Sequence, residues 1–322
     1  MGIRGVRRSL LKRALLALLP LTLGTMTGLA LAGQAAAESY TLTADLPYTS
    51  PAAGPAENQL DLYLPLEEFR PTGKAPVVIW IHGGGWYQGD KESAVLDKAE
   101  RFTRAGYLFV SVNYRLSPRV GDPDSLAPGR VMFPDQPRDV AEAVGWVSRN
   151  AGRYGGDGRK LVLMGHSAGG QIAALLATDR RFLERTGVGR SQILGVVSLD
   201  AVGLEVAPLT DPESRHRSED AKPAYWNAFG TPEENETLDR WKRASPLEYA
   251  GPNDPPFFFV VPDDVPLRLR EARTMSRRLG LDPGEAVWTV SKTHRQINHH
   301  FGVPAGRGQT IRSMRFVRRV SR

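Results

Sequence analysis

Apolar runs that alternate with amphipathic segments constrain the fold of this chain more than any other feature. Several of the runs are apolar throughout, as expected of strands that are covered on both faces. The segments between them have helical patterns, for example Val140, Val144 and Val147 on one face, the Ala- and Leu-rich stretch 168–178, and 267–279. The six strand-like runs lie at 77–81, 108–112, 161–164, 194–199, 256–261 and 286–290. This alternation predicts an α/β fold, with a mostly parallel, doubly wound sheet flanked by helices.

Two further segments complete the predicted domain, which spans 38–322. The runs 40–46 and 60–64 precede the parallel part and predict an antiparallel edge of the sheet. The segment 208–245 interrupts the alternation, because it is polar and carries four aromatic residues. It predicts either a small cap over a site or a long surface insertion.

Residues 1–37 have the three regions of a secretory signal peptide. A basic start is followed by an apolar run from 14 to about 32 and by small residues, with Ala35 and Ala37 matching the A-x-A cleavage pattern. The pair Arg7-Arg8 resembles the twin-arginine signal, and the general secretory route stays open. An uncleaved anchor is the alternative. We therefore expect an exported protein, periplasmic or secreted, with membrane contact only through the export signal.

The charge of the chain does not indicate a nucleic-acid partner, although its net charge is +7 and its pI is about 9.7. Five of the 42 basic residues lie within 1–37, which hold none of the 35 acidic ones, so the remainder is close to neutral. Absence of cysteine excludes disulfides, thiolate metal sites and a cysteine nucleophile. The histidines and carboxylates show no metal-ligand spacing, and we expect neither metal nor cofactor.

Ser167 stands where a strand-like run meets a helix-like one, within the pattern G-x-S-x-G formed with Gly165 and Gly169. A serine on such a tight turn needs neighbours without Cβ atoms, and its hydroxyl is then raised above the sheet. A second glycine run follows the strand-like segment 77–81. Its backbone N–H groups at Gly84 and Gly85, with that of Ala168, are the predicted donors to an oxyanion. Ser167 is the predicted nucleophile.

Five stretches stand in an order that resembles bacterial α/β-hydrolase carboxylesterases of the HGGGW type, which are related to feruloyl and acetyl-xylan esterases, kynurenine formamidases and the hormone-sensitive-lipase group. The stretches are HGGGW at 82–86, VSVNYRLSP at 111–118, YGGD at 154–157, GHSAGG at 165–170 and KTHRQIN at 292–298. The resemblance implies the α/β-hydrolase fold and a serine nucleophile, and it covers most of the chain from Pro76 to Gly302.

The order of such sites along the chain is serine, acid, histidine. His294 follows the strand-like run 286–290 and lies in the stretch that resembles the family's histidine loop, so it is the predicted base; His299 and His300 are alternatives. The acid is expected after the run 256–261, where the loop is about three residues shorter than in relatives. We predict Asp264 there, with Asp263 as the alternative acid and Asp200 as a third possibility.

Together these residues predict a serine hydrolase that cleaves carboxylic esters, from small molecules or carbohydrates, through an acyl-enzyme. Two alternatives remain open: an amidase that resembles kynurenine formamidase, and an inactive hydrolase fold that serves as a binding protein.

Overall fold

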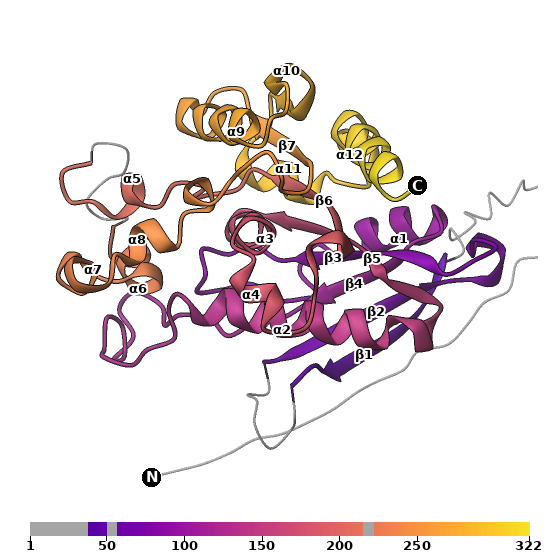
Figure 1. The fold of residues 1–322 in the computed structure, drawn as a ribbon, viewed down its shortest axis with the longest axis horizontal. Helices are drawn as coiled ribbons and strands as arrows, with labels where there is room; N and C mark the ends of the chain where they lie inside the picture. Colours follow the sequence, from indigo (N-terminus) through magenta and orange to yellow (C-terminus); the bar gives the residue numbers. More distant parts are fainter. Residues whose placement is uncertain (1–37, 50–56, 215–221) are drawn as a thin grey trace, which may run out of the picture. The chain divides into compact units, whose positions relative to one another are not determined.

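Eight strands form one sheet in the computed structural model, which describes residues 38–49, 57–214 and 222–322 (Figure 1). The predicted signal peptide lies outside the described residues. The strands lie in the order β1-β2-β4-β3-β5-β6-β7-β8. Their bounds are Tyr40–Pro47 (β1), Gln59–Pro65 (β2), Ala75–Ile81 (β3), Leu108–Val112 (β4), Gly156–His166 (β5), Ile193–Leu199 (β6), Phe257–Pro262 (β7) and Val287–Val290 (β8).

The sheet has the predicted architecture. From β4 to β8 all neighbouring strands are parallel, whereas β2 is antiparallel to both β1 and β4. The prediction of a mostly parallel sheet is confirmed, as is that of an antiparallel edge. The chain passes from β3 to β4 in one direction along the sheet and from β4 through β5 to β8 in the other, so right-handed crossovers place helices on both faces.

Side chains of the central strands alternate between two apolar layers. Ile79 and Leu163 belong to the core on one face, and Trp80 and Met164 to the core on the other. Each face is closed by helices, α2, α3 and α9 on the first and α1 and α12 on the second. Because both faces of a central strand are buried, its sequence is a continuous apolar run. The helices are α1 (Leu96–Arg104), α2 (Asp135–Asn150), α3 (Ala168–Thr178), α4 (Arg181–Glu184), α9 (Pro266–Arg278), α10 (Pro283–Ala286), α11 (His294–His299) and α12 (Arg307–Val320).

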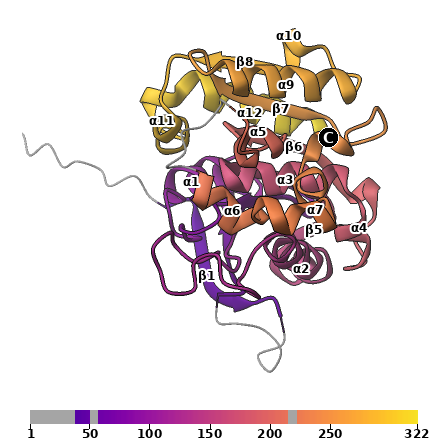
Figure 2. The ribbon, with the colours of Figure 1, turned by 90° about the vertical axis from the view of Figure 1, so that its left-hand side faces the viewer.

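The described residues of the segment 208–245 form four short helices near the carboxyl ends of the central strands (Figures 1 and 2). They are α5 (Ala207–Thr210), α6 (Lys222–Phe229), α7 (Pro232–Leu238) and α8 (Arg240–Arg243). Trp86 anchors α6, since its ring centroid lies 4.6 Å from that of Phe229, and the Trp86 side chain is buried. Arg130, fully buried, forms an ion pair of 2.7 Å with Glu234 on α7. These contacts hold the segment on the domain, and its role as a cap stays a prediction.

Candidate active site

Ser167 occupies a strained turn between β5 and α3. Its φ of 56° and ψ of −121° lie outside the regions that residues with a Cβ prefer, at a cost of about 1–3 kcal/mol. The Ser167 N–H donates to the carbonyl of Leu199 at 3.0 Å, and the Ser167 carbonyl accepts from the N–H of Gln171 at 3.1 Å. The turn places the serine in the wall of a cleft at the carboxyl end of the sheet. The structure thus gives Ser167 the backbone geometry that the motif predicts.

The two glycines of the motif are required by close backbone contacts. A Cβ on Gly165 would lie 2.2 Å from the carbonyl oxygen of Gly169, and a Cβ on Gly169 would lie 2.2 Å from that of Ile81. Side chains of any size would therefore push β5 and α3 apart, or α3 away from β3.

We expect Gly169→Ala to lower the free energy of unfolding by roughly 3 kcal/mol, because backbone rather than a flexible side chain opposes the added methyl. Urea denaturation followed by circular dichroism measures this change. The matched control is Gly308→Ala in α12, where nothing lies within 4 Å of the added Cβ. Equal stability of Gly169→Ala and the wild type would show that the turn is looser than the structure has it.

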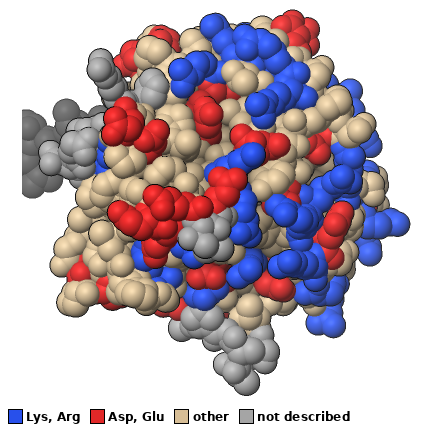
Figure 3. Space-filling model, turned by 60° about the vertical axis from the view of Figure 1, so that its left-hand side comes forward, with Lys and Arg blue, Asp and Glu red and all other residues tan. Residues whose placement is uncertain are grey.

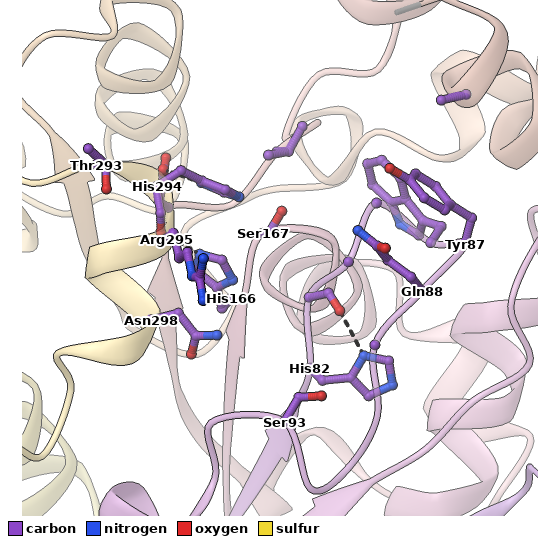
Figure 4. A pocket seen from close by; sticks show the side chains of 18 of the residues that line it. His82, Tyr87, Gln88, Ser93, His166, Ser167, Thr293, His294, Arg295 and Asn298 are labelled. Atoms are coloured by element: carbon purple, nitrogen blue, oxygen red, sulfur yellow. Dashed lines mark hydrogen bonds and ion pairs between the residues drawn. The ribbon is translucent and has the colours of Figure 1, made fainter. Parts of the chain in front are cut away.

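His294 is the first residue of α11, and an ordered helix start holds it. Thr293 caps the helix by accepting a hydrogen bond from the N–H of Gln296, and Ile297 is buried beneath it. The imidazole Nδ1–H donates to Oδ2 of Asp200 at 2.5 Å, which leaves Nε2 as the acceptor nitrogen. In Figure 4 the ring of His294 points toward the hydroxyl of Ser167. Between these two described residues there is no hydrogen bond, a gap that sites without substrate often show.

Asp200, and not Asp264, is the carboxylate that His294 contacts. β5 and β6 are neighbours in register, with His166 opposite Leu199, so Ser167 and Asp200 each follow one of two paired residues. The N–H of Asp200 donates to the carbonyl of Val260 at 2.7 Å, and its φ of 42° turns the side chain toward α11. Asp200 is buried, with 2% of its side chain exposed, whereas 44% of the His294 side chain is exposed.

The predictions of Asp264 and Asp263 as partners of His294 are therefore wrong for this structure. The loop after β7 is too short: β7 ends at Pro262 and α9 begins at Pro266. Asp263 is exposed and accepts a hydrogen bond from the hydroxyl of Ser291. Asp264, also exposed, lines the cleft and makes no hydrogen bond or ion pair with any residue that the structure describes. The third possibility weighed from the sequence, Asp200, is the one the geometry supports.

His166, the variable residue of the serine motif, supports His294 from below. Its Nε2–H donates to the backbone carbonyl of His294 at 3.0 Å, and the two ring centroids are 4.4 Å apart. Burial, together with the neighbouring His294, holds the pKa of His166 well below its usual value. His166 therefore stays neutral and fixes the backbone of His294 without competing for its proton.

His82, at the start of the glycine run, is also buried and neutral. Its ring stacks on Tyr114 with centroids 4.4 Å apart. Its Nδ1–H donates to the carbonyl of Gly83 at 2.8 Å, the dashed line in Figure 4. Burial lowers the pKa of His82 from 6.5 to about 4. His82 thus helps to shape the glycine loop.

We expect the buried histidines to make the domain acid-sensitive. The unfolded chain takes up a proton at His82 below its pKa of 6.5, and the folded chain only near pH 4. The stabilisation is therefore complete above pH 6.5 and is lost as the pH falls to about 4, by roughly 3 kcal/mol for His82. Urea denaturation at several pH values measures this loss, which should be smaller in His82→Phe, a variant that keeps the stacking. His300→Phe is the control, and an identical pH dependence in His82→Phe and the wild type would contradict the assignment.

The glycine loop lies against the serine turn. Among Gly83, Gly84 and Gly85, it is Gly83 that approaches the serine, since a Cβ on it would lie 3.0 Å from the Ser167 Cβ. Gly84 and Gly85 have φ values of 126° and 62°, and both line the cleft. The N–H groups of these glycines and of Ala168 donate to no group in the described part of the chain. The predicted donors Gly84, Gly85 and Ala168 remain a prediction, and the contacts add Gly83, which the sequence analysis omitted.

The remaining histidines lie apart from this arrangement. His299 is exposed at the cleft wall, and His300 accepts from the ammonium group of Lys292 at 3.4 Å. His216 lies outside the described residues. Neither His299 nor His300 contacts Ser167 or Asp200 through any hydrogen bond in the part of the chain described, so the choice of His294 among the late histidines agrees with the geometry.

The cleft around Ser167 is large and open, with a volume of about 1360 Å³, and both apolar and polar side chains line it. The glycine loop forms one wall, α11 and the start of α9 another, and Ala224 and Tyr225 of α6 the third. Across residues 38–49, 57–214 and 222–322, no group of three His, Asp or Glu side chains could hold a metal ion. Over the same ranges, no helix has both the length and the hydropathy to cross a bilayer.

Comparison with known families identifies the chain over most of its length. The family model BD-FAE matches residues 60–267. Esterase LipQ of Mycobacterium tuberculosis is 30% identical over 287 residues, which are 87% of this chain and 61% of LipQ. Esterase LipC of the same organism is 27% identical over 217 residues, 65% of this chain and 49% of LipC. The chain thus spans about three fifths or less of these two relatives.

Solved structures show the same fold. A truncated carbohydrate esterase from gut microbiota superposes with a TM-score of 0.67 at 19% identity, over 89% of this chain and 98% of the other. An inhibited esterase B from Lactobacillus rhamnosis superposes with a TM-score of 0.66 at 21% identity, over 88% of each chain. At these identities the likeness establishes the α/β-hydrolase fold and nothing about the substrate.

Proposed function

Because the chain belongs to the BD-FAE family of α/β-hydrolases, we propose that it is a serine hydrolase that cleaves carboxylic esters, with Ser167 as nucleophile, His294 as base and Asp200 as acid. The observation that carries the proposal is the hydrogen bond of 2.5 Å between Asp200 and His294, at the cleft wall that also holds Ser167 on its strained turn. A serine hydroxyl alone is a weak nucleophile, and a histidine held by a carboxylate is the usual means of activating it.

The first half of the reaction forms an acyl-enzyme. His294 Nε2 takes the proton of the Ser167 hydroxyl as the Ser167 oxygen attacks the ester carbonyl. Buried Asp200 stabilises the imidazolium through the Nδ1–H bond. The oxyanion accepts hydrogen bonds from the free N–H groups of the glycine loop and Ala168. His294 then gives its proton to the departing alkoxide, and the alcohol leaves.

The second half releases the acid. Water enters the open cleft, His294 Nε2 removes one of its protons, and the hydroxide attacks the acyl carbonyl of Ser167. The tetrahedral intermediate collapses when His294 returns the proton to the serine oxygen. The chain supplies every group that this route requires, and it needs neither a metal nor a cofactor.

The dimensions of the cleft favour a substrate larger than a short acyl ester. Its volume of about 1360 Å³ exceeds the range of roughly 300–1,000 Å³ that is typical of small-molecule sites. Polar and charged side chains such as Arg119, Asp264 and Arg295 line it beside the aromatic Tyr87 and Tyr225. A carbohydrate-linked or aryl ester fits this mixed lining. Trp86 also lines the cleft, but most of its side chain is buried against Phe229 of α6.

Hydrolysis of a graded panel of p-nitrophenyl esters, beside feruloyl and acetyl-sugar esters, tests the proposal. We expect turnover of at least one ester by the wild type and none by Ser167→Ala. Turnover of N-formylkynurenine without turnover of any ester would replace the proposal by an amidase. Absence of turnover, together with no labelling by a fluorophosphonate probe, would indicate a binding protein with an inactive hydrolase fold.

We also propose export, on the basis of residues 1–37. The basic start, the apolar run and the A-x-A pattern support it. Mass spectrometry of the protein from its native host should show an N-terminus close to Glu38. A chain that retains residues 1–37 in the cell envelope would favour the uncleaved anchor instead.

A further inference from the structure

We propose that Arg268 is a positioning residue for the reaction: its buried guanidinium holds the carboxylate of Asp200 and sets the pH at which His294 becomes an effective base. The inference rests on the proposed function, in which Asp200 is the acid.

The two oxygens of Asp200 have different partners. Oδ2 accepts the hydrogen bond from His294, and Oδ1 lies 3.3 Å from Nε of Arg268. Both members of this ion pair are buried, with 7% of the Arg268 side chain and 2% of the Asp200 side chain exposed. In the part of the chain that the structure describes, Oδ1 has no aligned hydrogen bond. The arginine therefore acts on Asp200 as a buried charge rather than through a shared proton.

The position of Arg268 in the first turn of α9 explains why its side chain reaches Asp200. β7 leads into α9 through only three residues, and this short connection brings the first turn of α9 beside the end of β6. The other arginines of α9 lie at the surface. In Figure 2, α9 lies at the top of the molecule, and in Figure 3 many Lys and Arg side chains lie along the top of the face. Arg268 alone among the arginines of this helix is buried.

Burying a guanidinium and a carboxylate is costly unless each neutralises the other. Near a cation, an aspartate is kept ionised, and the same cation opposes a proton on the neighbouring imidazole. Other groups that face the pair are few: neutral His166 under His294, Glu271 buried one turn along α9, and the exposed Asp264 and Arg295 at the cleft wall. The charged group that directly contacts the carboxylate of Asp200 is Arg268.

The consequence is a defined change in the pH profile. Without the cation, Asp200 attracts a proton on His294 more strongly, so a higher pH is needed to free the base. We expect Arg268→Gln to move the midpoint of the acidic limb of kcat/KM upward by roughly half to one pH unit. The plateau of kcat should fall by about 10- to 100-fold with little change in KM, because the carboxylate is less well oriented.

Arg268→Lys and Arg270→Gln are the matched variants. The lysine keeps the charge, so its midpoint should stay within about 0.2 of the wild type while kcat falls. Arg270→Gln removes an exposed arginine of the same helix and should leave the profile unchanged. An acidic limb that does not move in Arg268→Gln, or one that moves equally in Arg268→Lys, would overturn the inference. Arg268→Met provides a second neutral variant if the glutamine does not fold.

A double-mutant cycle with Asp200→Asn separates this inference from the proposed function. If Arg268 acts through Asp200, Arg268→Gln should cost much less kcat/KM in the Asp200→Asn background than in the wild type. Full activity of Asp200→Asn would overturn the proposed acid. A severe loss in Asp200→Asn, with the same cost of Arg268→Gln in both backgrounds, would leave the acid in place and overturn the role of Arg268.

Discussion

Ser167→Ala should reduce kcat/KM for the best ester of the panel by about 10⁵- to 10⁶-fold. The substitution removes the hydroxyl that forms the acyl-enzyme and leaves His294, Asp200 and the glycine loop in place. Steady-state hydrolysis and burst kinetics measure the loss. A burst of alcohol release, expected in the wild type when deacylation is slow, should be absent from the variant.

Ser125→Ala is the control for this variant, because Ser125 lies outside the cleft and the change removes the same atom. Both proteins should have wild-type circular dichroism spectra. If Ser167→Ala keeps more than about a tenth of the wild-type rate, the nucleophile lies elsewhere.

Asp200→Asn should lower kcat by about 10⁴-fold, the second largest effect that the structure predicts. An amide in this position turns the imidazole to the wrong tautomer, and it no longer stabilises the imidazolium. It also leaves the cation of Arg268 buried without its partner, and we expect a loss of folding stability of about 3–5 kcal/mol. The kinetics are therefore measured at a temperature where circular dichroism shows the variant to be folded.

The comparison with the aspartates after β7 makes the test of Asp200 specific. Asp263→Asn should have wild-type kinetics, because Asp263 is exposed and outside the cleft. Asp264→Asn, at the cleft wall, should lose no more than about tenfold. A reversed order, with Asp264→Asn inactive and Asp200→Asn active, would restore the acid predicted from the sequence.

The sequence predicted the sheet well because its strands are buried on both faces. The strand from Leu108 to Val112 and the helix from Ala168 to Thr178 have the predicted bounds. The strand predicted at 161–164 is longer, Gly156–His166, and the ends of the other predicted strands differ by at most two residues. An apolar run flanked by glycine is a local signal, and it needs no knowledge of distant contacts. Helix α1, which the sequence analysis did not predict, carries a buried Lys98 and Thr103 that interrupt its apolar face.

The acid that contacts His294 could not be predicted in the same way, because its position depends on how three neighbouring strands are aligned. Asp200 and Asp264 both follow a strand, and only the register of β5, β6 and β7 decides which carboxylate reaches His294. The feature of the sequence that could have indicated this is the short loop after β7. With only three residues, the loop does not bring the Asp264 carboxylate to His294. Arg268 had no local signal, because it occupies an ordinary position in an arginine-rich helix and its partner lies 68 residues earlier.

Peptide mapping of the protein after reaction with a p-nitrophenyl alkylphosphonate tests the central claim most directly. A phosphonate of this kind is attacked by an activated serine, and the adduct marks the nucleophile and its activation together. We predict one adduct, on the peptide that contains Ser167, formed stoichiometrically with p-nitrophenol release and lost in His294→Ala. An ester-hydrolysing protein that carries the adduct on another residue, or that reacts equally fast without His294, would contradict the account.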